Sequence, residues 1–313
     1  MFTSRLNTPI VLIIYKRPNT TRCVLDAISQ VSPSYLFVIG DGPRPESPNE
    51  VEKVNATRKL IRDVEFECEV ITNYSDINLG LRRRVSSGLD WVFEQVEEAI
   101  VLEDDCVPNS SFFYFCEELL DRFRNDDRIL VISGDNFQQG RKRTQYSYYF
   151  SRYNHCWGWA TWRRAWQHYN DSLNIWPIVR DGGWLMDILD QDRRAVKYWR
   201  DIFQCVYEGC IDSWAYYWTF ACWVQRGLTV LPNVNLVSNI GFGQGATHTL
   251  HRSRSANLPV EELDIPLKHP PFIIRDVRAD KFTQDTHYGT GYKKRIKKKI
   301  TQVLKNTGVL RIV

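Results

Sequence analysis

The first hundred residues of this chain repeat one pattern, in which a short apolar run is followed by a longer segment with helical spacing. Each apolar run has the length of a strand and ends at a turn signal. The predicted strands cover residues 9–15, 35–39, 67–72 and 99–102, and the predicted helices between them cover residues 19–31, 49–63 and 81–95. Strand–helix units of this length imply right-handed crossovers. The sequence therefore predicts an α/β fold with a mostly parallel central sheet flanked by helices.

The remainder of the chain is less regular and much richer in aromatic residues. Further helices are predicted at 110–124, 192–207 and 213–225, and further strands at 129–133 and 228–231. The 11 Trp and 15 Tyr residues of the chain are concentrated between positions 146 and 223. Aromatic rings fill protein cores, but they also stack on the apolar faces of sugars. The composition leaves both interpretations open.

Charge, cysteine content and hydropathy exclude several classes of protein. A net charge of +4 over 313 residues argues against a general nucleic-acid binder. The 8 cysteines are scattered without a CxxC pair, which favours reduced core residues over a disulfide framework or a zinc site. No apolar run is long enough to span a bilayer, and residues 1–15 lack the features of a signal peptide. A cytoplasmic location is the prediction.

The C-terminal residues 293–313 form a basic tail. Lysines and arginines alternate there with apolar residues at helical spacing, which predicts a basic amphipathic helix. Two interpretations are equally compatible with this pattern. The helix docks on its own domain, or it makes peripheral contact with a membrane surface.

Three acidic residues follow directly on the predicted strand 99–102, and they are the leading candidates for a functional site. Glu103, Asp104 and Asp105 fall at the carboxyl end of a buried strand, where open α/β sheets bind ligands. Adjacent carboxylates repel one another unless a cation lies among them, and a divalent ion that also carries phosphate oxygens meets that need. The alternative is a solvated acidic turn.

Other polar side chains are expected at the same edge of the sheet. Asp41 ends the second strand, and Asn78 and Arg82 follow the third. An arginine here can grip a pyrophosphate, or it can merely neutralise nearby acids. Asp41 can accept a hydrogen bond from a nucleobase or ribose, or it can hold a turn.

Several motifs, in order and spacing, resemble glycosyltransferases of the GT-A type. The resemblance is to the N-acetylglucosaminyltransferase I-like enzymes and their bacterial relatives in particular, and it covers about residues 9–250. It rests on residues 11–18 (VLIIYKRP), 78–80 (NLG), 102–105 (LEDD), 157–162 (WGWATW) and 212–214 (DSW). It implies a Rossmann-like GT-A domain over residues 1–250, an aromatic-rich acceptor-side half, and a C-terminal extension over residues 251–313.

The resemblance also implies roles for the acid cluster and its neighbours. Asp105 matches the acid that binds Mn²⁺ (or Mg²⁺) bridged to the donor diphosphate. Glu103 and Asp104 match residues that contact the ribose and the sugar. The first-strand turn, with Arg17, and Asp41 match positions that cradle the nucleoside.

The same resemblance places the catalytic base beside a tryptophan. Asp212 is the only acid in that stretch, because positions 213 and 215 are Ser and Ala. Asp212 also falls where a helix N-cap is expected, so a capping role is the alternative. Trp157 and Trp159 shape the donor and acceptor pocket or pack in the core. His248, in a glycine-rich loop, is the candidate second metal ligand.

Together these features predict a metal-dependent, inverting glycosyltransferase. The donor would be a nucleotide sugar, with UDP favoured and UDP-N-acetylglucosamine a candidate, and the acceptor a glycan or a lipid-linked sugar. Two alternatives remain. One is a nucleotide-sugar-binding protein without turnover. The other is a sugar-1-phosphate nucleotidyltransferase, which the absence of glycine from residues 15–19 disfavours.

Overall fold

The predicted strand–helix alternation builds one half of an eight-stranded sheet. The computed structural model describes residues 5–242 and 257–289. Its first four strands are adjacent and parallel in the order β3-β2-β1-β4. Their bounds are β1 Ile10–Ile14, β2 Tyr35–Gly40, β3 Glu69–Tyr74 and β4 Glu98–Glu103. Every residue of β1 is buried, as expected for a central parallel strand covered on both faces.

The sheet as a whole is mostly parallel, as predicted, but its other half also contains antiparallel pairs. The order continues from β4 through β8, β6 and β9 to the edge strand β7, and β8 is antiparallel to both β4 and β6. These strands are β6 Ile129–Ser133, β7 Tyr148–Ser151, β8 Trp159–Trp162 and β9 Leu228–Pro232. Parallel neighbours need a long crossover, usually a helix, and residues 134–158 contain no helix. β8 therefore runs in the opposite direction to its neighbour β6.

A second, two-stranded sheet lies directly behind the acid cluster. It pairs β5 (Cys106–Pro108) with β10 (Val237–Asn239) in antiparallel fashion. Asn239 is paired with Cys106, so the chain that follows β10 is brought beside the turn that joins β4 to β5.

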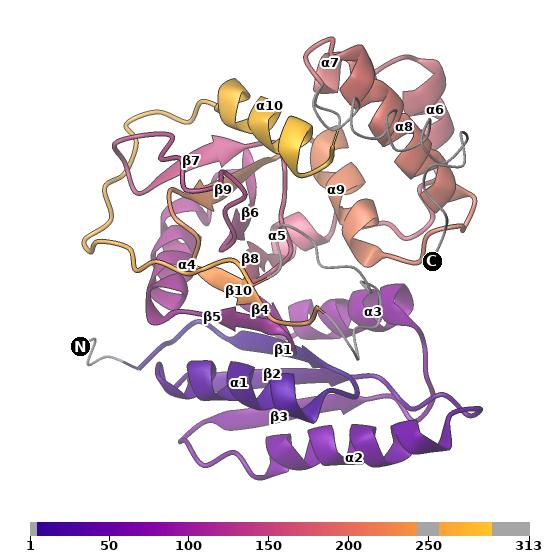
Figure 1. The fold of residues 1–313 in the computed structure, drawn as a ribbon, viewed down its shortest axis with the longest axis vertical. Coiled ribbons are helices and arrows are strands. Elements are labelled where there is room, and N and C mark those ends of the chain that lie inside the picture. The colour runs from indigo at the N-terminus through magenta and orange to yellow at the C-terminus, as the bar shows by residue number, and fades with distance from the viewer. Residues whose placement is uncertain (1–4, 243–256, 290–313) are drawn as a thin grey trace, which may run out of the picture.

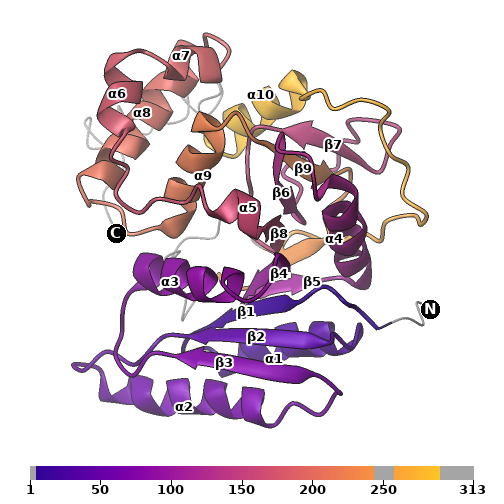
Figure 2. The same ribbon diagram turned by 180° about the vertical axis from the view of Figure 1, so that it is seen from behind.

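Helices cover both faces of the parallel half. They are α1 Pro18–Ser29, α2 Pro48–Arg62 and α3 Leu81–Phe93, while α4 Ser110–Phe123 packs on β4, β6 and β8. The order of the strands reverses direction after β3, so right-handed crossovers put α1 and α2 on one face and α3 on the other. Figures 1 and 2 show this arrangement from opposite sides. The point of reversal, between β1 and β4, positions the site described below.

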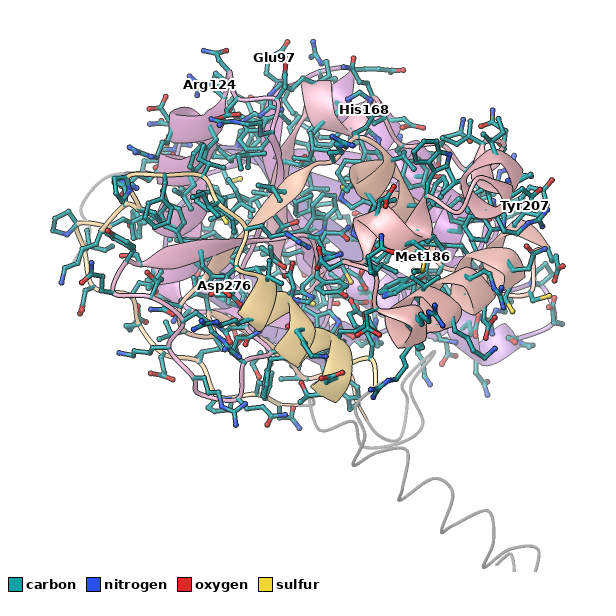
Figure 3. All side chains as sticks on the ribbon, turned by 90° about the horizontal axis from the view of Figure 1, so that it is seen from above. Glu97, Arg124, His168, Met186, Tyr207 and Asp276 are labelled. Atoms are coloured by element: carbon teal, nitrogen blue, oxygen red, sulfur yellow. The ribbon has the colours of Figure 1, made fainter. Side chains whose placement is uncertain are left out.

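The aromatic-rich segment forms a helical part whose rings pack mostly in the core. Its helices are α5 Arg163–Trp166, α6 Trp176–Asp181, α7 Leu185–Ile188, α8 Arg193–Tyr207 and α9 Trp214–Val224, and α10 Val277–Thr286 packs on β7. Figure 3 shows Tyr207 at the end of α8, well away from Asp276 at the start of α10. Helix α9 is apolar on almost every side and is buried accordingly. Within the described ranges, no helix has the length and apolarity needed to cross a bilayer.

Candidate active site

A cavity of about 440 Å³ lies at the carboxyl ends of β1 and β4, where the order of the strands reverses. In open α/β sheets the loops diverge at such a point and leave a crevice for a ligand. The turn after β1, the loop after β2, the start of α3, the acid cluster and the start of α9 all contribute to its lining. Residues 156–157 and 239–242 line it as well, so seven separate segments meet at one site, and the size is that of an ordinary small-molecule pocket.

Arg17 neutralises part of the acid cluster. Its Nη2 lies 2.7 Å from Asp104 Oδ1, and its Nη1 lies 2.6 Å from Asp105 Oδ2. Both carboxylates are buried, and Asp104 also accepts a hydrogen bond from the backbone N–H of Tyr15 at 3.1 Å. Burial opposes the charge of Arg17, but the charges of Asp104 and Asp105 outweigh it and raise the pKa of Arg17. The guanidinium is therefore a permanent cation within the cluster.

The cluster still contains more acid than Arg17 can neutralise. Burial, and then the charge of Asp105, raise the pKa of Glu103 well above its ordinary value against the effect of Arg17. Burial likewise raises the pKa of Asp104. The indole of Trp214 hydrogen-bonds the Glu103 carboxyl group. A further cation would therefore be stabilised here.

The acid cluster fits a divalent ion only if substrate phosphates complete the ion's ligand shell. Among the described residues, no three His, Cys, Asp or Glu side chains are arranged to hold a metal ion. Carboxylate oxygens are nevertheless hard ligands, and Mg²⁺-type sites often use one or two carboxylates and complete their shell with substrate phosphates. Asp105, which lines the cavity, is suited to that mode.

Asp41 holds the loop before α3 in place. Its Oδ1 accepts hydrogen bonds from the backbone N–H groups of Gly42 and Leu79, both at 2.9 Å. Its Oδ2 accepts from Gly80 N at 3.2 Å and from Asn78 Nδ2 at 3.0 Å. Burial raises the pKa of Asp41, while these backbone donors act in the opposite direction. The turn-holding role is confirmed, and both Asp41 and Asn78 also line the cavity.

Sequence reasoning missed a charged group beside the part of the cavity lined by Tyr15 and Arg44. Glu50, in the first turn of α2, accepts a 2.6 Å hydrogen bond from Tyr15 Oη and a 3.2 Å bond from Arg44 N, and it pairs with Lys16. Tyr15 and Arg44 line the cavity, and the Arg44 side chain is 44% exposed. The sequence feature that could have revealed this group is Arg44, a cation just after the turn at Asp41. Arg44 therefore lines the cavity while its Nη1 lies 3.8 Å from Glu50 Oε1.

Arg84 lines the cavity, whereas the predicted phosphate ligand Arg82 does not. Arg84 is buried and donates hydrogen bonds to the carbonyl oxygens of Gly40, at 3.2 Å, and Asn73, at 2.7 Å. It therefore ties together the ends of β2 and β3. Arg82 and Arg84 have different surroundings because side chains two positions apart on a helix point in different directions.

Asp212 faces the cavity rather than capping α9, so the capping interpretation is wrong. The N-cap is Ser213, and no side chain caps the helix. The Asp212 carboxylate lies 3.5 Å from Arg82 Nε, and its side chain is 56% exposed. Gly80, at φ 80°, lies so close that a Cβ there would be 3.3 Å from Asp212 Oδ2. Arg82 also lies over the ring of Tyr217, which holds the pair against α9.

Trp157 and Trp159 occupy different environments. Trp157 is half-buried, lines the cavity, and packs edge-on against Phe242 at 5.7 Å between ring centroids. Trp159 is 1% exposed and stacks on Trp214 at 5.4 Å, behind the cavity wall. Gly158, at φ 71°, turns the backbone between them. The ligand-binding role predicted for Trp159 is therefore replaced by a core role.

The glycine-rich segment begins directly against the metal candidate. A Cβ on Gly241 would lie 1.9 Å from Asp105 Oδ2 and 2.8 Å from Arg17 Nη1, so only glycine fits there. Gly241 and Phe242 line the cavity. The predicted metal ligand His248 and the basic tail, residues 293–313, lie outside the described residues.

The sequence matches no protein-family model and no curated protein. Among solved structures, one similar chain is the 4-diphosphocytidyl-2C-methyl-D-erythritol synthase of Anaerococcus prevotii, at 11% identity and a TM-score of 0.30. The alignment covers 50% of this chain and 72% of that one. A likeness this low carries no inference about function, which must be argued from the site itself.

Proposed function

We propose that the chain is a metal-dependent GT-A glycosyltransferase that transfers a sugar from a nucleotide sugar to an acceptor hydroxyl. One observation carries the proposal. A single cavity at the reversal point of the sheet contains the buried acid cluster with Arg17 on one side and the partly exposed Asp212 on the other. The motif resemblance assigns donor binding and base catalysis to these same two groups.

The donor would lie along the cavity from Arg44 to Trp157. Tyr15, Arg44 and the Asp41–Asn78 loop surround the nucleoside end, and Arg17 faces the diphosphate. Mn²⁺ or Mg²⁺ would be held by Asp105. When bound, the ion stabilises the negative charge that develops on the departing nucleoside diphosphate. The half-buried ring of Trp157 supplies an apolar wall for the sugar.

Asp212 would act as the general base. Its exposure leaves it accessible to an acceptor hydroxyl, whose proton it would accept as the oxygen attacks the donor sugar. Attack on the face opposite the leaving diphosphate inverts the configuration at that carbon. Arg82 positions the carboxylate from α3, and Gly80 leaves room for it.

The acceptor and the cellular setting are extensions of this proposal. All eight cysteines are free, as expected for a reducing compartment such as the cytoplasm. A glycan or a lipid-linked sugar is the proposed acceptor, and the basic tail would bring the enzyme to a membrane that presents it.

Calorimetry with nucleotides tests the proposal. UDP, GDP and CDP are titrated with and without Mn²⁺ into the native chain, the Asp105→Asn variant, and the control Asp121→Asn, which removes a carboxylate that is 76% exposed on α4. We expect one nucleotide to bind with Mn²⁺, and Asp105→Asn alone to abolish the metal-dependent part. Absence of nucleotide binding under every condition refutes the proposal. Metal-dependent binding with no release of the nucleotide from any UDP-sugar, across an acceptor panel, would indicate a binding protein instead.

A further inference from the structure

We propose that Arg17 is a movable counter-ion, which neutralises Asp105 in the empty site and is transferred to the nucleotide diphosphate when a divalent ion takes its place. This inference rests on the proposed function. Its starting point is that both oxygens of the Asp105 carboxylate already have partners. Oδ2 lies 2.6 Å from Arg17 Nη1, and Oδ1 accepts a 3.5 Å hydrogen bond from Cys106 Sγ.

Among the described residues, Arg17 and Gly241 both crowd Asp105 Oδ2. Gly241 covers this oxygen so closely that a Cβ there would lie 1.9 Å away. The carboxylate is fixed from behind as well, because Ile240 N donates a 2.9 Å hydrogen bond to the Asp105 carbonyl oxygen. An ion that binds Oδ2 would therefore compete with the guanidinium for this oxygen.

Arg17 is anchored in a way that allows its side chain to move while its backbone stays in place. The residue is the N-cap of α1, and its carbonyl oxygen accepts hydrogen bonds from Thr21 N at 3.0 Å and from Thr21 Oγ1 at 2.8 Å. Its guanidinium lines the cavity with a side-chain exposure of 21%. Its Nε has no hydrogen-bond partner among the described residues. The planar guanidinium can therefore exchange two carboxylates for phosphate oxygens, with which its geometry is equally compatible.

Charge balance then makes binding of the metal and the nucleotide interdependent. Arg17 and a divalent ion together would place three positive charges beside Asp104 and Asp105, and the displaced guanidinium would lose both of its partners. A diphosphate supplies the negative charge that both cations need. The ion alone should therefore bind weakly, and UDP should raise its affinity by a factor in the usual range for coupled sites, about 5–150-fold.

The test measures Mn²⁺ binding to the full chain, with and without UDP, by the loss of the free-ion EPR signal. Removing the cation in Arg17→Met should raise the affinity for Mn²⁺ alone about 10-fold and abolish the enhancement by UDP, in keeping with the coupling above. Arg17→Lys should retain weak binding of the ion alone. The control Arg22→Met removes an exposed arginine of the same helix and should behave as the native chain does.

Two results would overturn the inference. One is a folded Arg17→Met variant, as judged by circular dichroism, that binds Mn²⁺ alone no better than the native chain does. The other is independent binding of Mn²⁺ and UDP to the native chain, which applies even if the variant fails to fold. If UDP does not bind at all, the proposed function fails, while the comparison of Mn²⁺ affinities still decides whether Arg17 competes with the ion.

Discussion

The Glu50→Gln substitution tests whether Glu50, Lys16 and Arg44, beside the cavity, are held together by charge. Burial alone would raise the pKa of Glu50, but hydrogen bonds from Lys16 and Tyr15 lower it from 4.5 to about 2. A difference of that size is worth about 3 kcal/mol of folding free energy at full strength. The Lys16 and Arg44 side chains border solvent, at 19% and 44% exposure, so screening reduces the expected contribution to about 1–2 kcal/mol.

The sign of the pH dependence follows from the lowered pKa. The native state binds a proton at Glu50 less readily than the unfolded state does, so the contribution is fully present above the unfolded pKa of 4.5. It is lost as the pH falls from about 5 toward 2. The native chain should therefore exceed Glu50→Gln in unfolding free energy by about 1–2 kcal/mol at pH 7 and by much less at pH 3.

Urea denaturation of both proteins at pH 7, 5, 4 and 3, followed by circular dichroism, measures this difference. The matched control is Glu46→Gln, an exposed acid in the loop just before α2, which should change the unfolding free energy by less than about 0.5 kcal/mol. A difference between the native chain and Glu50→Gln that is the same at pH 3 as at pH 7 would refute the electrostatic account. So would a difference no larger than that of the control.

Three further substitutions separate catalysis, binding and stability. Asp212→Asn should lower kcat by about 10²–10⁴-fold in a UDP-release assay and leave donor binding, measured by calorimetry, unchanged. The control is Glu208→Gln, which changes an exposed acid. An unaltered kcat would show that Asp212 is not the base. Trp159→Ala should lower the unfolding free energy by about 3–5 kcal/mol in urea, because its ring is fully packed. Trp157→Ala should cost less stability and weaken donor binding, and the reverse order of the two effects would contradict the assignment of the two rings.

The local sequence pattern was sufficient to predict the first half of the fold. The strands predicted at 9–15 and 99–102 are β1 and β4, and the intervening helices are found within two residues of their predicted limits. This worked because apolar periodicity and turn residues act over short stretches of chain. The direction of β8 was not predictable in this way. It depends on which strands β8 pairs with, β4 and β6, after a connection from β6 that contains no helix.

The sequence by itself determined which edge of the sheet holds the candidate site: three acids lie at the end of one buried strand, and Asp41 and Asn78 follow two others. Only the tertiary structure decided the partners of these groups. Arg17 and Asp105 are 88 positions apart in the chain, and Asp41 and Asn78 are 37 apart. The tertiary structure likewise separated Trp157 from Trp159 across the turn at Gly158. Residue patterns report how each segment folds locally, whereas pairing of charges and exclusion from solvent depend on distances that exist only once the segments have packed.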